Sequence, residues 1–302
     1  MKIIFMGTPD FSISSLISIL NSRHKLLAVV TAPDKERGRG KKLSFTPVKQ
    51  FSVENKIPVY QPEKLKGNSE FVEQMRSLEP DLFVVVAFRI LPKEVFDIPK
   101  YGSFNLHASL LPKYRGAAPI QWALIKGETE TGLTTFKLAE KVDTGNLYLQ
   151  EKVEIKNEDN FGTLHDKLSE IGSKIVLDTI NLIESGKFEL KLQDDSLATP
   201  APKITKEICE IDWNKSAEEI HDLVRGLSPH PTAFFIYNNK VIKIYKTEID
   251  TGTNLKPFEF SQSKTELTVG CGKDAIRILE IQQEGKKRMN TVEFLRGFSF
   301  TG

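Results

Sequence analysis

The first half of the chain alternates short apolar runs with amphipathic segments. Residues 2–6 (KIIFM), 26–31 (LLAVVT) and 81–88 (DLFVVVAF) are rich in apolar and β-branched residues, a pattern typical of strands buried on both faces. Between the first two, apolar side chains recur at helical spacing, which predicts a helix from Asp10, taken as its N-cap, to Leu20. Buried strands separated by helices predict an α/β fold with a mostly parallel sheet covered on both faces.

Further elements are expected before residue 189. They are a short strand, a helix, a hairpin at the sheet edge and a long amphipathic helix, at residues 103–107, 117–126, 132–155 and 163–185. Gly186 is the residue that can end the long helix.

The character of the sequence changes after residue 189. Residues 190–205 contain two prolines and show little periodicity, which indicates a linker. Ser216 and Glu219 then have the spacing of a capping box, and several short strands separated by turn residues follow. Short strands of this kind predict a small β-barrel. We therefore expect an N-terminal domain over 1–189, the linker, and a C-terminal domain over 206–302.

Composition narrows the function classes. Of 302 residues, 39% are hydrophobic and 27% charged, which is ordinary for a globular protein, and the net charge is only +2. A polyanionic partner would therefore have to meet a local basic patch. Cys209 and Cys271 belong to no metal-binding or disulfide pattern, so we expect two buried thiols in a reducing cytosol. No apolar stretch has the length of a membrane span or a signal peptide.

The stretch NLHASLLPKYRGAAPI carries the strongest candidate chemistry. Asn105 and His107 are two positions apart, so on a strand their side chains lie on the same face. They end a presumed parallel strand, where open α/β sheets place their active sites. An amide donor beside an imidazole can hold an oxyanion and move a proton on a carbonyl substrate. The alternative is that Asn105 makes a turn and His107 caps a backbone carbonyl.

Two loops accompany this pair. Pro112 and Gly116 make the first loop a stiff one, in which Leu110 and Leu111 are available to a flat apolar ligand, although structural loops of this kind are common. The second loop, VDTG, supplies Asp143, which can orient or charge His107. An aspartate in such a turn more often bonds its own backbone in an Asx-turn.

A basic, glycine-rich loop runs from Asp34 to Ser44. Its cations suit phosphate contacts, with a solvated loop as the alternative. The cluster Lys286-Lys287-Arg288 is a second candidate patch, and a solvated turn is its alternative. The basic loop lacks the spacing of a phosphate-binding loop, and the first turn (GTPDF) lacks Gly-x-Gly-x-x-Gly, so a dinucleotide cofactor is unsupported.

Several segments together resemble the folate-dependent formyltransferases, and the match runs the whole length of the chain. They are FMGTPDFS, TAPDKERGRGKKLSFTPVK, VVVAFRILPKEVF, the NLHASLLPKYRGAAPI stretch, VDTG, KITKEICEIDWNKSAEEIHDLVRGLSPHP and IQQEGKKRM. The core motif is shared by formyltransferases of several specificities. The basic insertion and the C-terminal segments are similar to the branch of the family that acts on methionyl-tRNA.

The resemblance implies a fold, a reaction and a set of sites. The fold is a Rossmann-like domain followed by an OB-like barrel, and the reaction transfers a formyl group from 10-formyltetrahydrofolate to the amino group of methionyl initiator tRNA, for translation initiation. The catalytic positions are Asn105, His107 and Asp143, the folate loop is Ser109, Leu110, Leu111 and Pro112, and Arg39 falls on the basic residue that contacts the acceptor arm. We expect the neighbouring cations Arg37, Lys41 and Lys42 to bind the tRNA with it. Nothing in the sequence marks a dimer interface, so we expect a cytoplasmic monomer, and the reaction requires no metal and no membrane.

Other readings stay open from the sequence. The nearest is a formyltransferase acting on an amino sugar or on glycinamide ribonucleotide, which needs neither the basic insertion nor this C-terminal domain. A non-catalytic RNA-binding protein and a nicotinamide dehydrogenase come next. The chain departs from the family at Phe88-Arg89, where Tyr-Gly is usual, so the resemblance implies a different wall for the pterin pocket.

Overall fold

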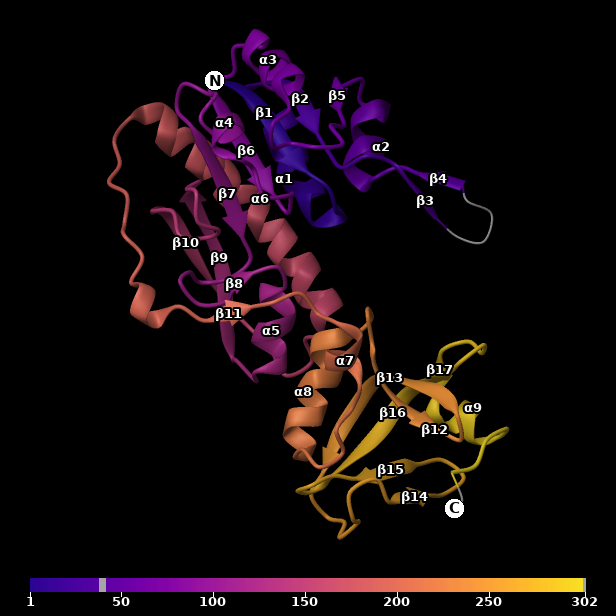
Figure 1. The fold of residues 1–302 in the computed structure, drawn as a ribbon. Helices are drawn as coiled ribbons and strands as arrows, with labels where there is room; N and C mark the ends of the chain where they lie inside the picture. Colours follow the sequence, from indigo (N-terminus) through magenta and orange to yellow (C-terminus); the bar gives the residue numbers. More distant parts are fainter. Residues whose placement is uncertain (38–41, 301–302) are drawn as a thin grey trace. The chain divides into compact units, whose positions relative to one another are not determined.

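The computed structural model describes residues 1–37 and 42–300, which divide into two compact units (Figure 1). Unit 1 comprises Met1–Gly116, Thr131–Val153 and His165–Pro200. Unit 2 comprises Ala117–Glu130, Glu154–Leu164 and the described part of Ala201–Gly302. Two segments from within the expected N-terminal domain, Ala117–Glu130 and Glu154–Leu164, therefore fold with the C-terminal region rather than with the N-terminal sheet.

Unit 1 holds a large sheet and the helices around it. Its first elements are β1 (Lys2–Gly7), the 3-10 helix η1 (Asp10–Ser12), α1 (Ile13–Leu20), β2 (Lys25–Val30), β3 (Lys35–Arg37), β4 (Lys42–Ser44), α2 (Pro47–Glu54), β5 (Val59–Tyr60) and α3 (Ser69–Ser77). The others, wholly or mainly in this unit, are β6 (Leu82–Val86), α4 (Lys93–Phe96), β7 (Ser103–His107), β8 (Arg115–Gly116), β9 (Glu130–Lys137), β10 (Leu147–Glu154), α6 (Phe161–Ser185) and the 3-10 helix η2 (Asp195–Leu197).

The sheet of unit 1 is mostly parallel, as the apolar runs predict. Its strand order is β10-β9-β7-β6-β1-β2-β5. From β7 to β5 every pair is parallel, and β9 runs antiparallel to β7. The predicted hairpin β9–β10 forms the edge. The α/β expectation is confirmed.

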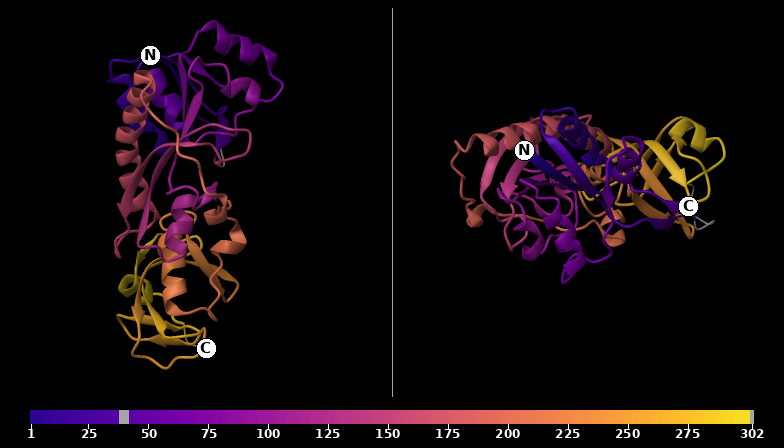
Figure 2. Two further views of the ribbon diagram at one scale, coloured as in Figure 1. Left: turned by 90° about the vertical axis from the view of Figure 1, so that its left-hand side faces the viewer. Right: turned by 90° about the horizontal axis from the view of Figure 1, so that it is seen from above.

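Helices cover both faces of this sheet. Alternate strand residues such as Met6 and Val85 form one buried cluster with Met75 of α3 and Val95 of α4. The long helix α6 covers the opposite face and runs along the sheet (Figure 2). Gly186, which ends α6, has φ +63°, the left-handed conformation that favours glycine at a helix C-terminus.

Two local expectations are corrected. Asp10 is not the N-cap of a helix: its Oδ1 accepts from the adjacent Phe11 N, the first turn is 3-10, and α1 begins at Ile13. Ser12 is buried because its Oγ donates to Val86 O at 2.8 Å, so a tertiary contact decides how this turn winds. The basic segment is also more than a loop, since β3 and β4 pair as an antiparallel hairpin stem.

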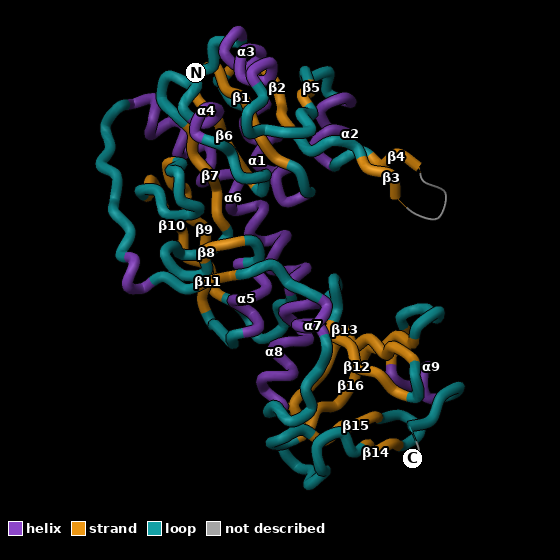
Figure 3. Tube along the Cα trace, viewed as in Figure 1, coloured by secondary structure: helices purple, strands orange, loops and turns teal. Residues whose placement is uncertain are grey.

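Unit 2 holds an antiparallel sheet and short helices (Figure 3). Its elements are α5 (Pro119–Ile125), α7 (Lys206–Cys209), α8 (Ala217–Leu227), β12 (Ala233–Tyr237), β13 (Lys240–Asp250), β14 (Phe260–Gln262), β15 (Leu267–Gly270), β16 (Ala275–Gln283), β17 (Met289–Asn290) and α9 (Thr291–Leu295), while β11 (Pro200–Ala201) lies at the boundary of the two units.

The sheet of unit 2 curves strongly. Its order is β12-β13-β16-β15-β14, with β17 beside β16. The rings of Phe235 and Tyr237 on β12 lie 6.1 and 5.4 Å from that of Phe260 on β14, so the two edge strands approach each other through their aromatic side chains. The capping box of Ser216 and Glu219 at the start of α8 is confirmed. A C-terminal antiparallel β domain is thus present, as the short strands predict.

Helix α5 packs within unit 2 against α8. A Cβ added to Gly226 of α8 would lie 2.7 Å from Ile125 Cγ1 and 3.1 Å from Gln121 O, so the two helices are in close contact where glycine stands. Among residues 1–37 and 42–300, no helix combines the length and apolarity needed to cross a membrane.

Candidate active site

Asn105 and His107 lie at the carboxyl end of β7, on the face of the sheet away from α6. The intervening Leu106 faces α6, because a Cβ added to Gly172 of that helix would be 2.9 Å from Leu106 Cδ2. Side chains alternate along a strand, so Asn105 and His107 share the opposite face, as their spacing predicts. Asn105 is half-buried and His107 is only 6% exposed.

The two ring nitrogens of His107 contact different groups. Nε2 lies 2.8 Å from the carbonyl oxygen of Tyr114. A carbonyl can only accept, so Nε2 carries the hydrogen and donates it, as the capping alternative anticipated. Nδ1 lies 3.9 Å from Oδ2 of Asp143. Since Nε2 is committed to a backbone carbonyl, Nδ1 is the nitrogen that can take up or release a proton.

Asp143 reaches across to a different loop instead of bonding its own turn. Its Oδ2 accepts from Gly116 N at 2.9 Å, and its backbone is left-handed, with φ +55°. Two residues on, Gly145 has no room for a side chain, because a Cβ there would lie 1.6 Å from Lys137 O. The Asp-Thr-Gly sequence thus makes a turn tight enough to present its carboxylate to His107.

The loop after β7 is held mainly by its own buried groups. Ser109 is fully buried, and its Oγ donates to Lys113 O at 2.6 Å. Leu111 is 3% exposed and packs with Phe136 and Leu147, so the expectation that its side chain is available to a flat ligand is wrong. The side chain of Leu111 points inward because the hairpin β9–β10 supplies these apolar contacts. Leu110 and Pro112 are half-buried.

Thr134 and Gln150 of the edge hairpin fix this loop, and sequence reasoning missed both. Thr134 Oγ1 donates to Ser109 O at 2.6 Å and accepts from Leu111 N at 3.1 Å. Gln150 Nε2 donates to Leu111 O at 2.8 Å and to Thr134 Oγ1 at 3.1 Å. Thr134 is paired with His107 across the β7–β9 ladder, so only the register of that pairing could have revealed its role.

Gln193, in the expected linker, was also missed. Its Nε2 donates to the backbone oxygens of Asp143 and Gly145, and its Oε1 accepts from the guanidinium of Arg115. Gln193 therefore joins the two loops that flank His107. The segment lacks periodicity, so no pattern in the sequence marked this residue.

The stem of the basic hairpin is anchored at its base. Asp34 accepts from Gln61 Nε2 at 2.9 Å and pairs with Lys49 Nζ. The hydrogen bonds from Gln61 and then Lys49 hold the pKa of Asp34 below its ordinary value. Arg37 and Lys42 face each other in the paired backbone of β3 and β4, whereas Arg39 and Lys41 lie outside the described residues.

The other sequence candidates have local partners. Arg89 donates from Nη1 to Glu63 O at 3.0 Å and from Nη2 to Pro62 O at 2.7 Å, so it ties together the loops after β5 and β6. In the C-terminal cluster, Arg288 pairs with Glu280, and Lys286 and Lys287 are exposed at the turn between β16 and β17. Cys209 and Cys271 are free and buried, as expected, and burial raises the pKa of the Cys271 thiol to about 11.

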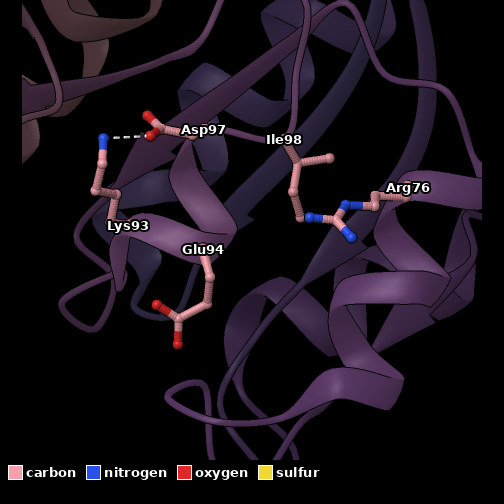
Figure 4. A pocket seen from close by; sticks show the side chains of 5 residues that line it. All are labelled: Arg76, Lys93, Glu94, Asp97 and Ile98. Carbon is pink, nitrogen blue, oxygen red and sulfur yellow. Dashed lines mark hydrogen bonds and ion pairs between the residues drawn. The ribbon is translucent and has the colours of Figure 1, made fainter.

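A polar pocket on unit 1 is separate from these residues (Figure 4). It is lined by Arg76 of α3, by Lys93, Glu94 and Asp97 at α4, and by Ile98. Its charges are largely compensated within the pocket wall, since Lys93 Nζ lies 2.5 Å from Asp97 Oδ2. In the part of the chain that the structure describes, no group of three or more His, Cys, Asp or Glu side chains is arranged to hold a metal ion.

The fold and the site together define a class of protein. A parallel sheet that carries an amide, an imidazole and a carboxylate around one strand end is suited to acyl-type transfer. The chain belongs to the formyl transferase family: the model of the formyl transferase domain matches residues 1–180, and that of the formyl transferase C-terminal domain matches residues 203–299.

Relatives match along almost the whole chain. The methionyl-tRNA formyltransferase of Caldanaerobacter subterraneus subsp. tengcongensis is 46% identical over 299 residues, covering 98% of this chain and 97% of the relative. That of Clostridioides difficile is 45% identical, and that of Bacteroides fragilis 42%, with 98% and 100% of this chain covered and 97% and 96% of each relative.

Solved structures share the fold at lower identity. The sugar 3N-formyl transferase WlaRD, crystallised with dTDP and 5-N-formyl-THF, has a TM-score of 0.70 at 20% identity, covering 95% of this chain and 99% of its own. The methionyl-tRNA formyltransferase from Clostridium thermocellum has a TM-score of 0.58 at 19% identity, covering 84% and 95%. At these identities the likeness shows the fold alone.

Proposed function

We propose that this chain transfers the formyl group of 10-formyltetrahydrofolate to the amino group of methionyl initiator tRNA, in the cytosol and for translation initiation. The observation that carries the proposal is the position of His107, held between Tyr114 O and the carboxylate of Asp143 at the end of β7. Identity of 42–46% to methionyl-tRNA formyltransferases over nearly the whole chain supports the substrate.

The chemistry follows from what formyl transfer requires. An amine attacks an amide-like carbonyl, so negative charge develops on the former carbonyl oxygen, the attacking nitrogen loses a proton, and the leaving folate nitrogen gains one. Asn105 donates a hydrogen bond to the developing oxyanion, and His107 assists as donor or proton carrier through Nδ1. Asp143 orients or charges His107 and helps to accept the proton that the attacking nitrogen loses. No step in this scheme uses a metal.

Binding of the two substrates is assigned to different segments. The folate donor lies along Ser109, Leu110, Leu111 and Pro112, where the half-buried Leu110 and Pro112 offer side-chain surface and the buried Ser109 and Leu111 hold the loop in place. The basic hairpin enters the acceptor arm of the tRNA through Arg37, Arg39, Lys41 and Lys42. The C-terminal β domain contacts the tRNA backbone, and the protein acts as a monomer.

The substrate is tested by direct competition among amine acceptors. The protein is incubated with 10-formyltetrahydrofolate and either methionyl initiator tRNA, a dTDP-linked amino sugar or glycinamide ribonucleotide, and each formylated product is quantified. The proposal predicts formyl-methionine as the dominant product. Preferential formylation of the sugar or the ribonucleotide would establish the rival formyltransferase reading, and no turnover with any acceptor would favour the RNA-binding one.

The role of the basic hairpin needs a charge-matched control. Arg39→Ala should raise the KM for tRNA, because each contact with a tRNA phosphate contributes to affinity mainly through counterion release. The dissociation constant for folate should not change. The slope of affinity against salt concentration should fall as well. Arg76→Ala is the control, since Arg76 is an exposed arginine paired with Glu73 on α3. Equal tRNA affinity in the two variants would refute the contact.

A further inference from the structure

The segment that follows α6 is not a passive connection, because it is bonded to both loops that flank His107. Lys191 exchanges two backbone hydrogen bonds with Leu147, at 2.8 and 3.0 Å, just after the Asp143 turn. Further on, Thr199 accepts twice from the other loop, its Oγ1 from Tyr114 N and its carbonyl from Arg115 N, both at 2.8 Å. Between these two attachments the chain runs from the Asp143 turn to the loop of Tyr114 and Arg115.

Gln193 is the side chain at which this segment joins the two loops. Its Nε2 donates to Asp143 O at 3.0 Å and to Gly145 O at 2.7 Å. Its Oε1 accepts from Arg115 Nε at 3.1 Å and Nη2 at 2.7 Å. Both hydrogens and both lone pairs of the amide are thereby used. Within residues 191–197, all of which the structure describes, Gln193 is the only residue that is not exposed.

The Asp143 turn needs such support. Asp143 has a left-handed backbone, which is costly for a residue with a side chain and persists only where its surroundings hold it. The backbone of Gly145 lies so close to Lys137 O that a Cβ at this position would be 1.6 Å from it, so the turn has little room to move. The amide of Gln193 binds the carbonyls on either side of Thr144 and thus fixes the direction in which the Asp143 carboxylate leaves the turn.

We propose that Gln193 is a positioning residue, which holds the Asp143 carboxylate at the distance from His107 Nδ1 that formyl transfer uses. The inference rests on the proposed function, in which Asp143 serves His107. A glutamine suits the task because it donates to one loop and accepts from the other at the same time. A glutamate of equal size keeps the contact with Arg115 and sets an acceptor against two carbonyl oxygens.

The test compares Gln193→Ala, Gln193→Glu and the control Ser196→Ala in steady-state formylation. Ser196 lies in the same segment, and its N and Oγ both donate to Oδ1 of Asp194, which N-caps η2. Both Gln193 variants should lower kcat by about 10- to 100-fold, the scale expected for a displaced catalytic group, with the KM for the folate donor and the melting temperature near wild type. Ser196→Ala should match wild type in kcat.

If Gln193 serves stability alone, its variants will have a lower melting temperature and an unchanged kcat, and that result overturns the inference. A loss of kcat that is matched by a rise in the KM for folate overturns it as well. Asp143→Asn, measured alongside, separates a failure of this inference from a failure of the proposed role of Asp143. If Asp143→Asn is inactive and both Gln193 variants have normal kcat, the inference fails and the proposed function stands. If Asp143→Asn has normal activity, the proposed role of Asp143 fails and the inference fails with it.

Discussion

The buried hydroxyl of Thr134 should contribute strongly to the stability of unit 1. Thr134 is 0% exposed, and its Oγ1 makes hydrogen bonds with Ser109 O, Leu111 N and Gln150 Nε2. Thr134→Val replaces that hydroxyl with a methyl group of almost the same volume. The packing is therefore kept, and the loop after β7 loses its polar anchor.

The expected cost can be worked from the groups left behind. Ser109 O and Leu111 N each lose this buried partner, and an unsatisfied buried donor or acceptor costs about 1–3 kcal/mol. Gln150 Nε2 keeps its bond to Leu111 O at 2.8 Å, so its loss is partial. The free energy of opening of unit 1 should fall by about 2–6 kcal/mol on this basis.

Hydrogen exchange read by mass spectrometry on peptides from β1 and β6 measures that opening directly. A loss of this size corresponds to roughly 30- to 25,000-fold faster exchange of the most protected amides. Thr144→Val is the matched control, because Thr144 Oγ1 donates to Lys141 O at an exposed position, and its effect should stay within about 0.5 kcal/mol. Equal protection in wild type and Thr134→Val would refute the reasoning.

Three further predictions concern single positions. Asn105→Ala should lower kcat about 100- to 1,000-fold with the fold intact, as for loss of one oxyanion donor, and a near-normal kcat would remove it from the mechanism. Gly145→Ala should destabilise unit 1 by at least about 3 kcal/mol, since its Cβ meets Lys137 O at 1.6 Å, and a thermal melt identical to wild type would contradict this. In unit 2, burial lowers the pKa of His221 below its ordinary value, against the opposing attraction of Asp222. The unfolded state therefore binds more protons than the folded state as the pH falls, and wild type should lose stability on going from about pH 7 to pH 5. His221→Gln should lose less, measured by urea unfolding followed through tryptophan fluorescence, and an unchanged pH dependence would contradict the assignment.

Patterns within single segments were sufficient to predict much of the fold. The strand 103–107, the end of α6 before Gly186 and the capping box of α8 all occur at the expected residues. Each depends on interactions a few residues apart, which a periodicity or a cap reveals. The spacing of Asn105 and His107 belongs to this class, because a strand alone puts both on one face.

The support around these residues depends on pairing between distant segments, which periodicity does not encode. Thr134 faces the loop only because β9 pairs with β7 in one register, and Leu111 turns inward because that hairpin offers Phe136 and Leu147. Gln193 lies in a stretch without regular structure. Asp10 had the residue type of an N-cap, but the buried contact of Ser12 with Val86 O settled the turn instead.

The central claim is that His107 and Asp143 act as one unit on the transferred formyl group, and a double-mutant cycle on formyl-methionine formation in a single turnover tests it most directly. The account predicts that His107→Ala and Asp143→Asn each lower the rate by about 100-fold or more, and that the double variant is scarcely slower than His107→Ala alone, because groups that act together lose their effect together. A double variant whose rate loss is the product of the two single losses, or a His107→Ala variant with a rate near wild type, would contradict the account.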